Sequence, residues 1–203
     1  MEINPAEIPA ISVYQHLLRT VMPRPIAWVS TKSNSGVANL APFSFFTAVG
    51  SAPPTLLFCP ANRRDGTPKD TLANILENGQ FVVNVVTESL AEAMNLTAAE
   101  LGSDESEFEL AGLHCAESQR VVVPRVRESP VSLECELQQH LPLGEGPGGA
   151  NIVIGRILHL HLDDSVVDAH GYADPELLQL IGRMGGNSYC RTGDRFDMRR
   201  PKL

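Results

Sequence analysis

The stretch RRDGTPKDTLANILENGQFVVNV (residues 63–85) combines clustered positive charge with a predicted helix and a predicted strand. Thr67 is expected to be the N-cap of the helix, with Pro68 at its first position, and Gly79 is expected to end it after about Glu77. The apolar run FVVNVV that follows predicts a strand. The stretch therefore predicts a helix that begins beside the arginines and is followed at once by a strand.

Positive charge at the start of a helix is typical of an anion site. A helix N-terminus presents unpaired backbone N–H groups and the positive end of the helix dipole, and Arg63, Arg64 and Lys69 would add charge-assisted contacts to a phosphate. We expect the carboxylate of Asp70 to turn back to the N-cap, which leaves Lys69 and Thr71 to face a ligand. The alternative is a solvated, capped helix with surface arginines, and these residues alone do not decide between the two.

The overall composition indicates a globular protein of 203 residues, for which we expect one domain. A net charge of -8 argues against a nucleic-acid surface and against an anionic membrane surface, because both need a basic footprint. The start MEINPAEIPA lacks the charged and apolar regions of a secretory signal, and no apolar run approaches the length of a membrane span. We therefore expect a cytoplasmic protein that binds neither nucleic acid nor membranes.

The candidates for metal binding are weak, and we expect no metal site. His159 and His161 alternate on one face of a predicted strand, but no third ligand stands at a suitable spacing, so a half-buried or interface histidine pair is preferred over a metal site. The cysteines lie far apart without a C-x-x-C pair, which argues against a zinc site or a disulfide framework. We expect reduced core or pocket thiols at Cys59, Cys115, Cys135 and Cys190.

The rest of the chain reads mainly as short strands. Residues 26–31 and an extended segment toward Phe46 predict a hairpin around a polar turn at 34–36. PPTLLFCP predicts a buried strand, and SPVSLECELQQHLPLG and NIVIGRILHLHLDDSVV predict a second hairpin. The acidic run 102–117 is expected on the surface, and a short helix is expected from Pro175. About six or seven strands with short helices favour a β-barrel or sandwich over a doubly wound parallel sheet.

Two further segments carry possible ligand contacts. NLAPFSFF (residues 39–46) contains a proline that cannot donate to a sheet, so its backbone groups and Ser44 could meet a planar heterocycle; an edge strand with core aromatics is the alternative. IGRMGGNSYCR (residues 181–191) could close over a ligand or form a helix end and surface tail. GEGPGG (residues 144–149) matches the dinucleotide fingerprint in letters only, because a strand-like run follows where a helix is needed, and a flexible hairpin loop is preferred.

Taken in order, PRPIAWVST, NLAPFSFF, PPTLLFCP, KDTLANI, FVVNVV, HLHLDDSVVD and RMGGNSY resemble the flavin reductase-like family of FMN-binding split β-barrels, in particular its flavoredoxin-like branch. The resemblance covers about residues 20–200 and rests on the order and spacing of the motifs. It implies a mainly β fold with short helices, a six-stranded split barrel of Greek-key type. It also implies a homodimer with FMN held in a groove near the subunit interface.

The resemblance implies a phosphate site at the start of the predicted helix. The FMN phosphate would meet Arg63, Lys69 and Thr71, with Asp70 counted among the cofactor-binding residues. This would explain why an acidic protein gathers positive charge at this point.

The resemblance implies a ring site on the neighbouring strands. The isoalloxazine edge would lie along the backbone of residues 39–41, and RMGGNSY would approach the flavin of its own subunit or of the partner. The residues implied at this end are Asn39, Leu40, Ala41, Ser44, Cys59, Arg183 and Tyr189.

The activity implied is that of an FMN-dependent NAD(P)H:flavin oxidoreductase, in which NADH or NADPH passes hydride to the flavin and electrons continue to a free flavin, a protein or a metal complex. The flavin carries this chemistry, so no catalytic side chain is expected. An FMN-binding electron carrier without NAD(P)H activity is the alternative from another class. A degenerate barrel that binds another cofactor or none is disfavoured, because an empty site would have no need of Arg63, Lys69 and Thr71 together. The acidic run 102–117 and the glycine loop 144–149 depart from many relatives and leave the electron donor and acceptor open.

Overall fold

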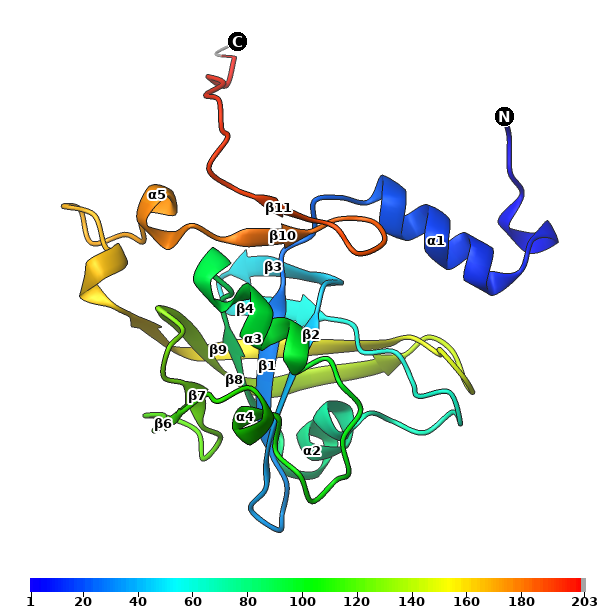
Figure 1. Ribbon diagram of the computed structural model, residues 1–203, viewed down its shortest axis with the longest axis horizontal. Helices are drawn as coiled ribbons and strands as arrows, with labels where there is room; N and C mark the ends of the chain where they lie inside the picture. Colours follow the sequence, from blue (N-terminus) through cyan, green and yellow to red (C-terminus); the bar gives the residue numbers. More distant parts are fainter. Residues whose placement is uncertain (202–203) are drawn as a thin grey trace.

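The computed structural model describes residues 1–201, and its largest element is an antiparallel seven-stranded sheet (Figure 1). The strand order is β2-β1-β5-β8-β9-β4-β3. Its strands are β1 (Ala27–Lys32), β2 (Ala38–Phe43), β3 (Phe46–Ser51), β4 (Pro54–Phe58), β5 (Gln80–Asn84), β8 (Val131–Pro142) and β9 (Asn151–Leu162). Two small sheets pair β6 (Cys115–Ala116) with β7 (Arg125–Val126) and β10 (Ile181–Arg183) with β11 (Tyr189–Arg191).

The helices are short, as the sequence predicted. They are α1 (Ala10–Thr20), α2 (Asp70–Asn78), α3 (Ala91–Leu96), α4 (Glu107–Leu110) and α5 (Pro175–Leu178), with single 3-10 turns at Pro5–Glu7, Glu88–Leu90 and Asp164–Val166. Within residues 1–201, no helix has the length and apolar character needed to span a membrane. The fold class, mainly β with short helices, is confirmed.

The sheet curls back on itself because its two edge strands are consecutive in the chain. β2 ends at Phe43 and β3 begins at Phe46, yet the two strands lie at opposite ends of the strand order. Only two residues join them, so the two edges must meet at this corner. The expected extended segment toward Phe46 is thus divided between β2 and β3, and the sheet has seven strands, within the six or seven predicted from the sequence and one more than the family resemblance implied.

An aromatic cluster fills the barrel interior. Phe58 lies between Phe43 and Phe81, at ring centroid distances of 5.2 and 5.5 Å. Leu72 and Ile75 of α2 belong to the same buried cluster, so α2 closes the barrel by its apolar face.

A second cluster lies on the outer side of β1 and β2, under α3 and α4. It includes Trp28, Leu40, Met94 and Phe108. The sequence prediction of a surface excursion over 102–117 is therefore wrong in part, because Phe108 and Glu107 are buried. Phe108 stands between two glutamates, which gave too weak a signal for a helix that packs on the barrel.

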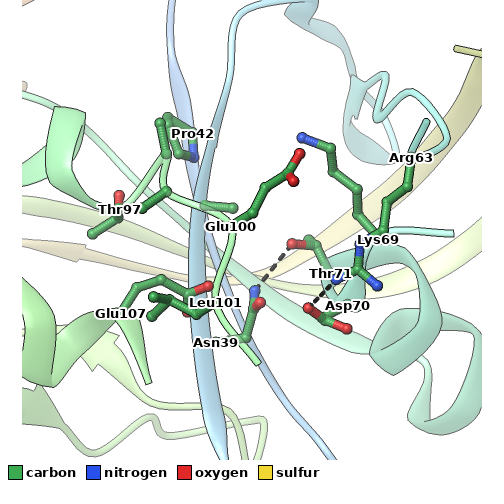
Figure 2. A pocket seen from close by; sticks show the side chains of 13 residues that line it. Asn39, Pro42, Arg63, Lys69, Asp70, Thr71, Thr97, Glu100, Leu101 and Glu107 are labelled. Carbon is green, nitrogen blue, oxygen red and sulfur yellow. Dashed lines mark hydrogen bonds and ion pairs between the residues drawn. The ribbon is translucent and has the colours of Figure 1, made fainter. Parts of the chain in front are cut away.

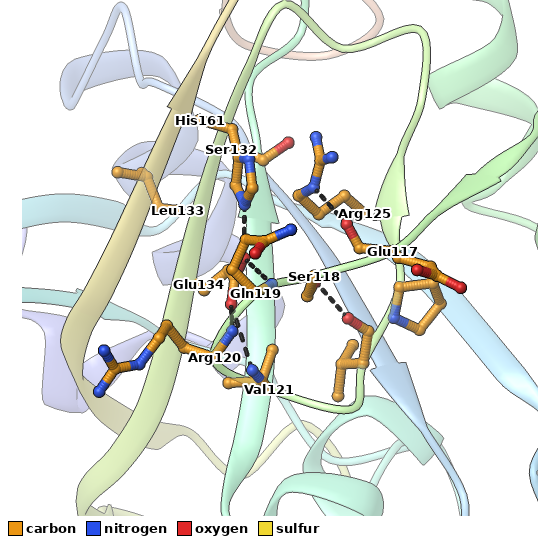
Figure 3. Close-up of polar contacts among 12 residues, drawn as sticks. Glu117, Ser118, Gln119, Arg120, Val121, Arg125, Ser132, Leu133, Glu134 and His161 are labelled. Atoms are coloured by element: carbon orange, nitrogen blue, oxygen red, sulfur yellow. Dashed lines mark hydrogen bonds and ion pairs between the residues drawn. The ribbon is translucent and has the colours of Figure 1, made fainter.

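The loop that follows α4 is fastened to the barrel by a buried carboxylate (Figure 3). The Glu134 side chain, on β8, accepts hydrogen bonds from the backbone N–H groups of residues 119–121 at 2.6 to 3.2 Å and contacts the Nε2 atom of His161. Burial raises the pKa of Glu134, but these hydrogen bonds outweigh it and hold the pKa below its ordinary value. Glu134 thus anchors residues 119–121 to the barrel, and Asn84 adds a second buried anchor by accepting the N–H of Val126 at 3.0 Å.

Candidate functional site

The start of α2 differs from the prediction in a way that leaves its N–H groups open. Lys69, not Thr67, is the N-cap, and within residues 1–201 no side chain caps this helix start. The backbone N–H and the hydroxyl of Thr67 instead bond to Asp65 Oδ1, at 2.9 and 2.6 Å, in an Asx turn that Gly66 completes. Gly79 ends the helix in the left-handed conformation, as predicted (φ 73°).

The carboxylate of Asp70 does not turn back to the N-cap. It forms an ion pair with the guanidinium of Arg63, so that prediction is wrong. Both side chains are about one-third exposed or less, and the pair places the Arg63 guanidinium beside the helix start. Thr71 is buried, and its hydroxyl accepts a hydrogen bond of 3.0 Å from the side-chain amide of Asn39 (Figure 2).

These residues form one wall of a pocket, here called the polar pocket, with a volume of about 80 Å³. The opposite wall is the loop that follows α3. Figure 2 shows the side chains of Lys69 and Glu100 pointing into the space between the two walls. The lining residues are Asn39, Ala41, Pro42, Arg63, Lys69, Asp70, Thr71, Thr97, Ala98, Ala99, Glu100, Leu101 and Glu107.

A second pocket, here called the ring pocket, adjoins the polar pocket and has a volume of about 200 Å³. Pro42 and Ala98 line both, so the two pockets lie side by side, and together they are here called the groove. The lining residues are Ile26, Pro42, Phe43, Ser44, Met94, Asn95, Ala98, Arg183 and Tyr189. The groove therefore has a charged end and a partly aromatic end.

Arg183 and Tyr189 meet at the ring pocket because residues 181–191 form a hairpin, which the sequence did not predict. Arg183 pairs with Tyr189 across β10 and β11, and its guanidinium lies 4.5 Å from the centroid of the tyrosine ring. The turn between these strands holds Gly185 and Gly186, and Gly186 adopts a φ of 60°. A ligand in the ring pocket would meet a cation stacked on an aromatic ring.

Arg24 supports this end of the groove, although the sequence gave no reason to select it. Its buried guanidinium donates to the carbonyls of Leu18, Val21 and Met184 at 2.7 to 3.0 Å and to the Ser44 hydroxyl at 3.3 Å. Burial lowers the pKa of Arg24, and the charge of Arg183 lowers it further. The contacts join the end of α1 to the residues that follow β2 and β10, and the contact to Met184 spans 160 positions, so no local pattern could indicate this cluster.

Two of the site residues implied by the family resemblance lie outside the groove, as does Arg64, which the sequence had offered as a phosphate contact. Leu40 lies on β2, is fully buried in the cluster of Trp28, and donates its backbone N–H to Glu107 Oε2 at 2.9 Å. The backbone N–H of Cys59 donates to the Phe45 carbonyl at 2.8 Å, and burial raises the pKa of the Cys59 thiol. Neither residue lines the polar pocket or the ring pocket.

The glycine loop 144–149 braces the loop that carries Arg63. The Asn62 side chain donates to the Gly146 carbonyl at 3.1 Å, and buried Asn151 donates to Asn62 Oδ1 at 2.8 Å. A Cβ atom on Gly149 would lie 2.4 Å from the Gly144 carbonyl oxygen, so the loop needs glycine there. The segment joins β8 to β9 as a hairpin loop, which agrees with the preferred interpretation of GEGPGG.

The histidine pair of β9 does not belong to the groove. His159 and His161 stack edge to face at 4.7 Å, and His161 contacts Glu134. Among residues 1–201 no cluster of three or more His, Cys, Asp or Glu side chains could hold a metal ion. His161 thus serves the loop anchor described above.

Comparison with known proteins places the chain among flavoproteins. The model of the flavin reductase like domain matches residues 18–180. The uncharacterized protein YwrF of Bacillus subtilis (strain 168) is 43% identical over 198 residues, which are 96% of each chain. Nitrilotriacetate monooxygenase component B from Bacillus cereus shares 36% identity at a TM-score of 0.92, covering 98% of each chain.

The 2-nitrobenzoate 2-nitroreductase NbaA of Pseudomonas fluorescens shares 32% identity at a TM-score of 0.90, covering 100% of this chain and 98% of that one. Flavoredoxins have the same fold at lower identity, and the similar structures include split barrels. The resemblance stated from the motifs and the split-barrel fold are both confirmed.

Proposed function

The chain belongs to the flavin reductase-like family, and from this premise we propose that it is an FMN-dependent oxidoreductase that takes hydride from NADH or NADPH. The family and the similar flavin-utilising oxidoreductases support a redox role that involves a flavin. That the flavin is FMN, and that a nicotinamide reduces it, is our proposal.

The observation that carries the proposal is that the two adjoining pockets of the groove differ in chemistry. FMN is an elongated molecule with a phosphate at one end and a planar ring system at the other. The uncapped start of α2, with Arg63 and Lys69 beside it, suits a phosphate. The ring pocket, with Arg183 over Tyr189 and with Met94 and Pro42 in its walls, suits a planar ring.

The fit at the phosphate end has to overcome local negative charge. Asp70, Glu100 and Glu107 also line the polar pocket. Asp70 is paired with Arg63, and burial raises the pKa of Glu107 although the hydrogen bond from the Leu40 N–H opposes this shift. The ammonium group of Lys69 and the unpaired N–H groups at the start of α2 therefore attract the phosphate. No capping side chain competes for these N–H groups.

When bound, the flavin would accept hydride and pass electrons on, so the protein needs no acid or base of its own. In this proposal Arg63, Lys69 and Thr71 hold the phosphate and Asn39 orients Thr71. Arg24 holds Ser44 and the Met184 carbonyl in place at the ring pocket. We assign no catalytic side chain.

The electron acceptor is a free flavin, a protein or a metal complex in this proposal. The names of two similar proteins agree with acceptors of different kinds. The protein from Bacillus cereus is a component of a monooxygenase, which implies a second protein, and the one from Pseudomonas fluorescens is a nitroreductase that acts on 2-nitrobenzoate. An FMN-binding electron carrier without nicotinamide activity is the competing function, and the experiment below separates the two.

We further propose that the protein is a homodimer. The helix α1 projects from the barrel, buries no residue and exposes Ile11, Tyr14 and Leu17 (Figure 1). Its last turn contacts the β10–β11 turn, where a Cβ atom on Gly185 would lie 2.8 Å from Arg19. A second copy that covers α1 would therefore lie next to the ring pocket.

The proposed function is tested by an absorbance spectrum of the protein with added FMN, followed by anaerobic addition of NADH and then NADPH. We expect bound FMN, seen as a flavin band between about 370 and 450 nm, that bleaches promptly with one of the two nucleotides. Bound flavin that bleaches only with a reduced protein donor would favour the electron carrier. No flavin binding would contradict both functions.

A further inference from the structure

Glu107 is a buried carboxyl group in the wall of the polar pocket, and the proposed phosphate contacts make no use of it. Its side chain is 6% exposed, on the first turn of α4. Within residues 1–201 no ion pair includes it. Burying a carboxyl group without a cation costs free energy. A ligand group that forms a hydrogen bond with it would lower this cost.

The position of this carboxyl group is fixed on both sides. Its Oε2 atom accepts the backbone N–H of Leu40 at 2.9 Å. The neighbouring Ser106 hydroxyl donates to the Ala38 carbonyl at 2.6 Å, and Phe108 is buried in the cluster of Trp28 and Leu40. The carboxyl group therefore cannot swing away from the pocket.

The second oxygen of Glu107 is not fully buried. Of its two oxygen atoms, only Oε2 has a hydrogen-bond partner. In the described chain, every fully buried side-chain oxygen has such a partner. The Oε1 atom must therefore be accessible, and Glu107 lines the polar pocket. An acceptor is thus held in place on the ligand side of the wall.

The chemistry of this acceptor excludes the phosphate and favours a hydroxyl group. A carboxylate repels a phosphate and offers it no proton, whereas it accepts a strong hydrogen bond from an O–H donor. The polar pocket joins the helix start to the ring pocket, and in FMN the segment between phosphate and ring is the ribityl chain, which carries hydroxyl groups. We propose that Glu107 binds a ribityl hydroxyl and so positions the flavin along the groove; this rests on the proposed function.

The test is a cycle that combines variants of Glu107 with monodeoxy analogues of FMN, each lacking one ribityl hydroxyl, with affinity measured by fluorescence quenching of the flavin. For the wild type we expect one analogue to bind about 10- to 100-fold more weakly than FMN. Glu107→Ala should weaken FMN binding by a similar factor and show no further loss with that analogue. Glu107→Gln keeps an acceptor for Leu40 and should show the same pattern with a smaller loss.

Glu109→Gln is the matched control, because Glu109 is an exposed glutamate on the same short helix. It should bind FMN and all analogues as the wild type does. The inference is overturned if, for every analogue, the loss of affinity from the missing hydroxyl is the same in the Glu107 variants as in the wild type. Glu107 then contacts no ribityl hydroxyl, although FMN still binds. If the wild type binds no FMN, the proposed function fails and the inference fails with it.

Discussion

At the scale of single residues, Gly155 shows how closely the barrel interior is packed. A Cβ atom at this position of β9 would lie 2.3 Å from Cζ of the buried Phe81 ring. We expect Gly155→Ala to lower the free energy of unfolding by about 1–3 kcal/mol, because the Phe81 ring must shift within a filled core. Urea unfolding measures it, with Gly193→Ala as control, since no heavy atom lies within 4 Å of that added Cβ. Equal stability of the two variants would contradict this account of the core.

The residues of the charged end were predictable from local sequence, and their partners were not. The arginine cluster and the start of a helix indicated Arg63, Lys69 and Thr71, which the structure brings together in the polar pocket. Glu107 lay in an acidic run where nothing marks one glutamate as buried. Its partner is the backbone of a residue 67 positions earlier in the chain, a contact that only the folded barrel creates.

At the scale of elements, the anchored loop depends on the ionised form of Glu134. Its folded pKa lies below the ordinary value of about 4.3, so its stabilisation is fully present above that value and is lost as the pH falls through the folded pKa. We expect Glu134→Gln to cost about 2–3 kcal/mol at neutral pH, because its amide N–H₂ would face backbone N–H groups. The difference from the wild type should shrink as the pH falls below about 4.

Urea unfolding between neutral and acidic pH measures this effect. Glu136→Gln is the control on the same strand, since its side chain is half exposed and its contact to Arg156 is 3.8 Å long. A constant difference between wild type and Glu134→Gln at all pH values would show that the charge of Glu134 does not hold the loop.

Most strands were predictable, because they combine apolar runs with clear turn residues. The hairpin of β1 and β2, the buried strand β4 and the long hairpin of β8 and β9 all match the predicted segments. The predicted start of α2 was wrong, because the N–H of Thr67 bonds to the Asp65 side chain and Thr67 is held in a tight turn before the helix. The helix α1 and the hairpin of β10 and β11 were missed. The helix α1 buries no residue, and the hairpin combines two buried residues of β10 with a mostly exposed β11, so neither element shows a regular apolar pattern.

At the scale of the whole molecule, α1 is an exposed apolar element on a protein with a net charge of -8. Ile11 is 64% and Leu17 45% exposed. We expect the wild type to elute as a dimer in size-exclusion chromatography with light scattering, and Leu17→Asp to shift it to monomer by placing a charge on this face. His16→Asp adds the same charge to the opposite side of α1 and should leave the dimer intact. A monomeric wild type would contradict the proposal.

The central claim is that the groove binds FMN with its phosphate at the start of α2, and calorimetric titration of FMN into the cofactor-free protein tests it most directly. Arg63→Ala combined with Lys69→Ala should weaken binding by about 10- to 1,000-fold, since two charge-assisted contacts are lost. Arg64→Ala is the control, because Arg64 belongs to the same loop, is exposed and does not line the polar pocket. Unchanged affinity in the double variant, or an equal loss in Arg64→Ala, would contradict the placement of the phosphate.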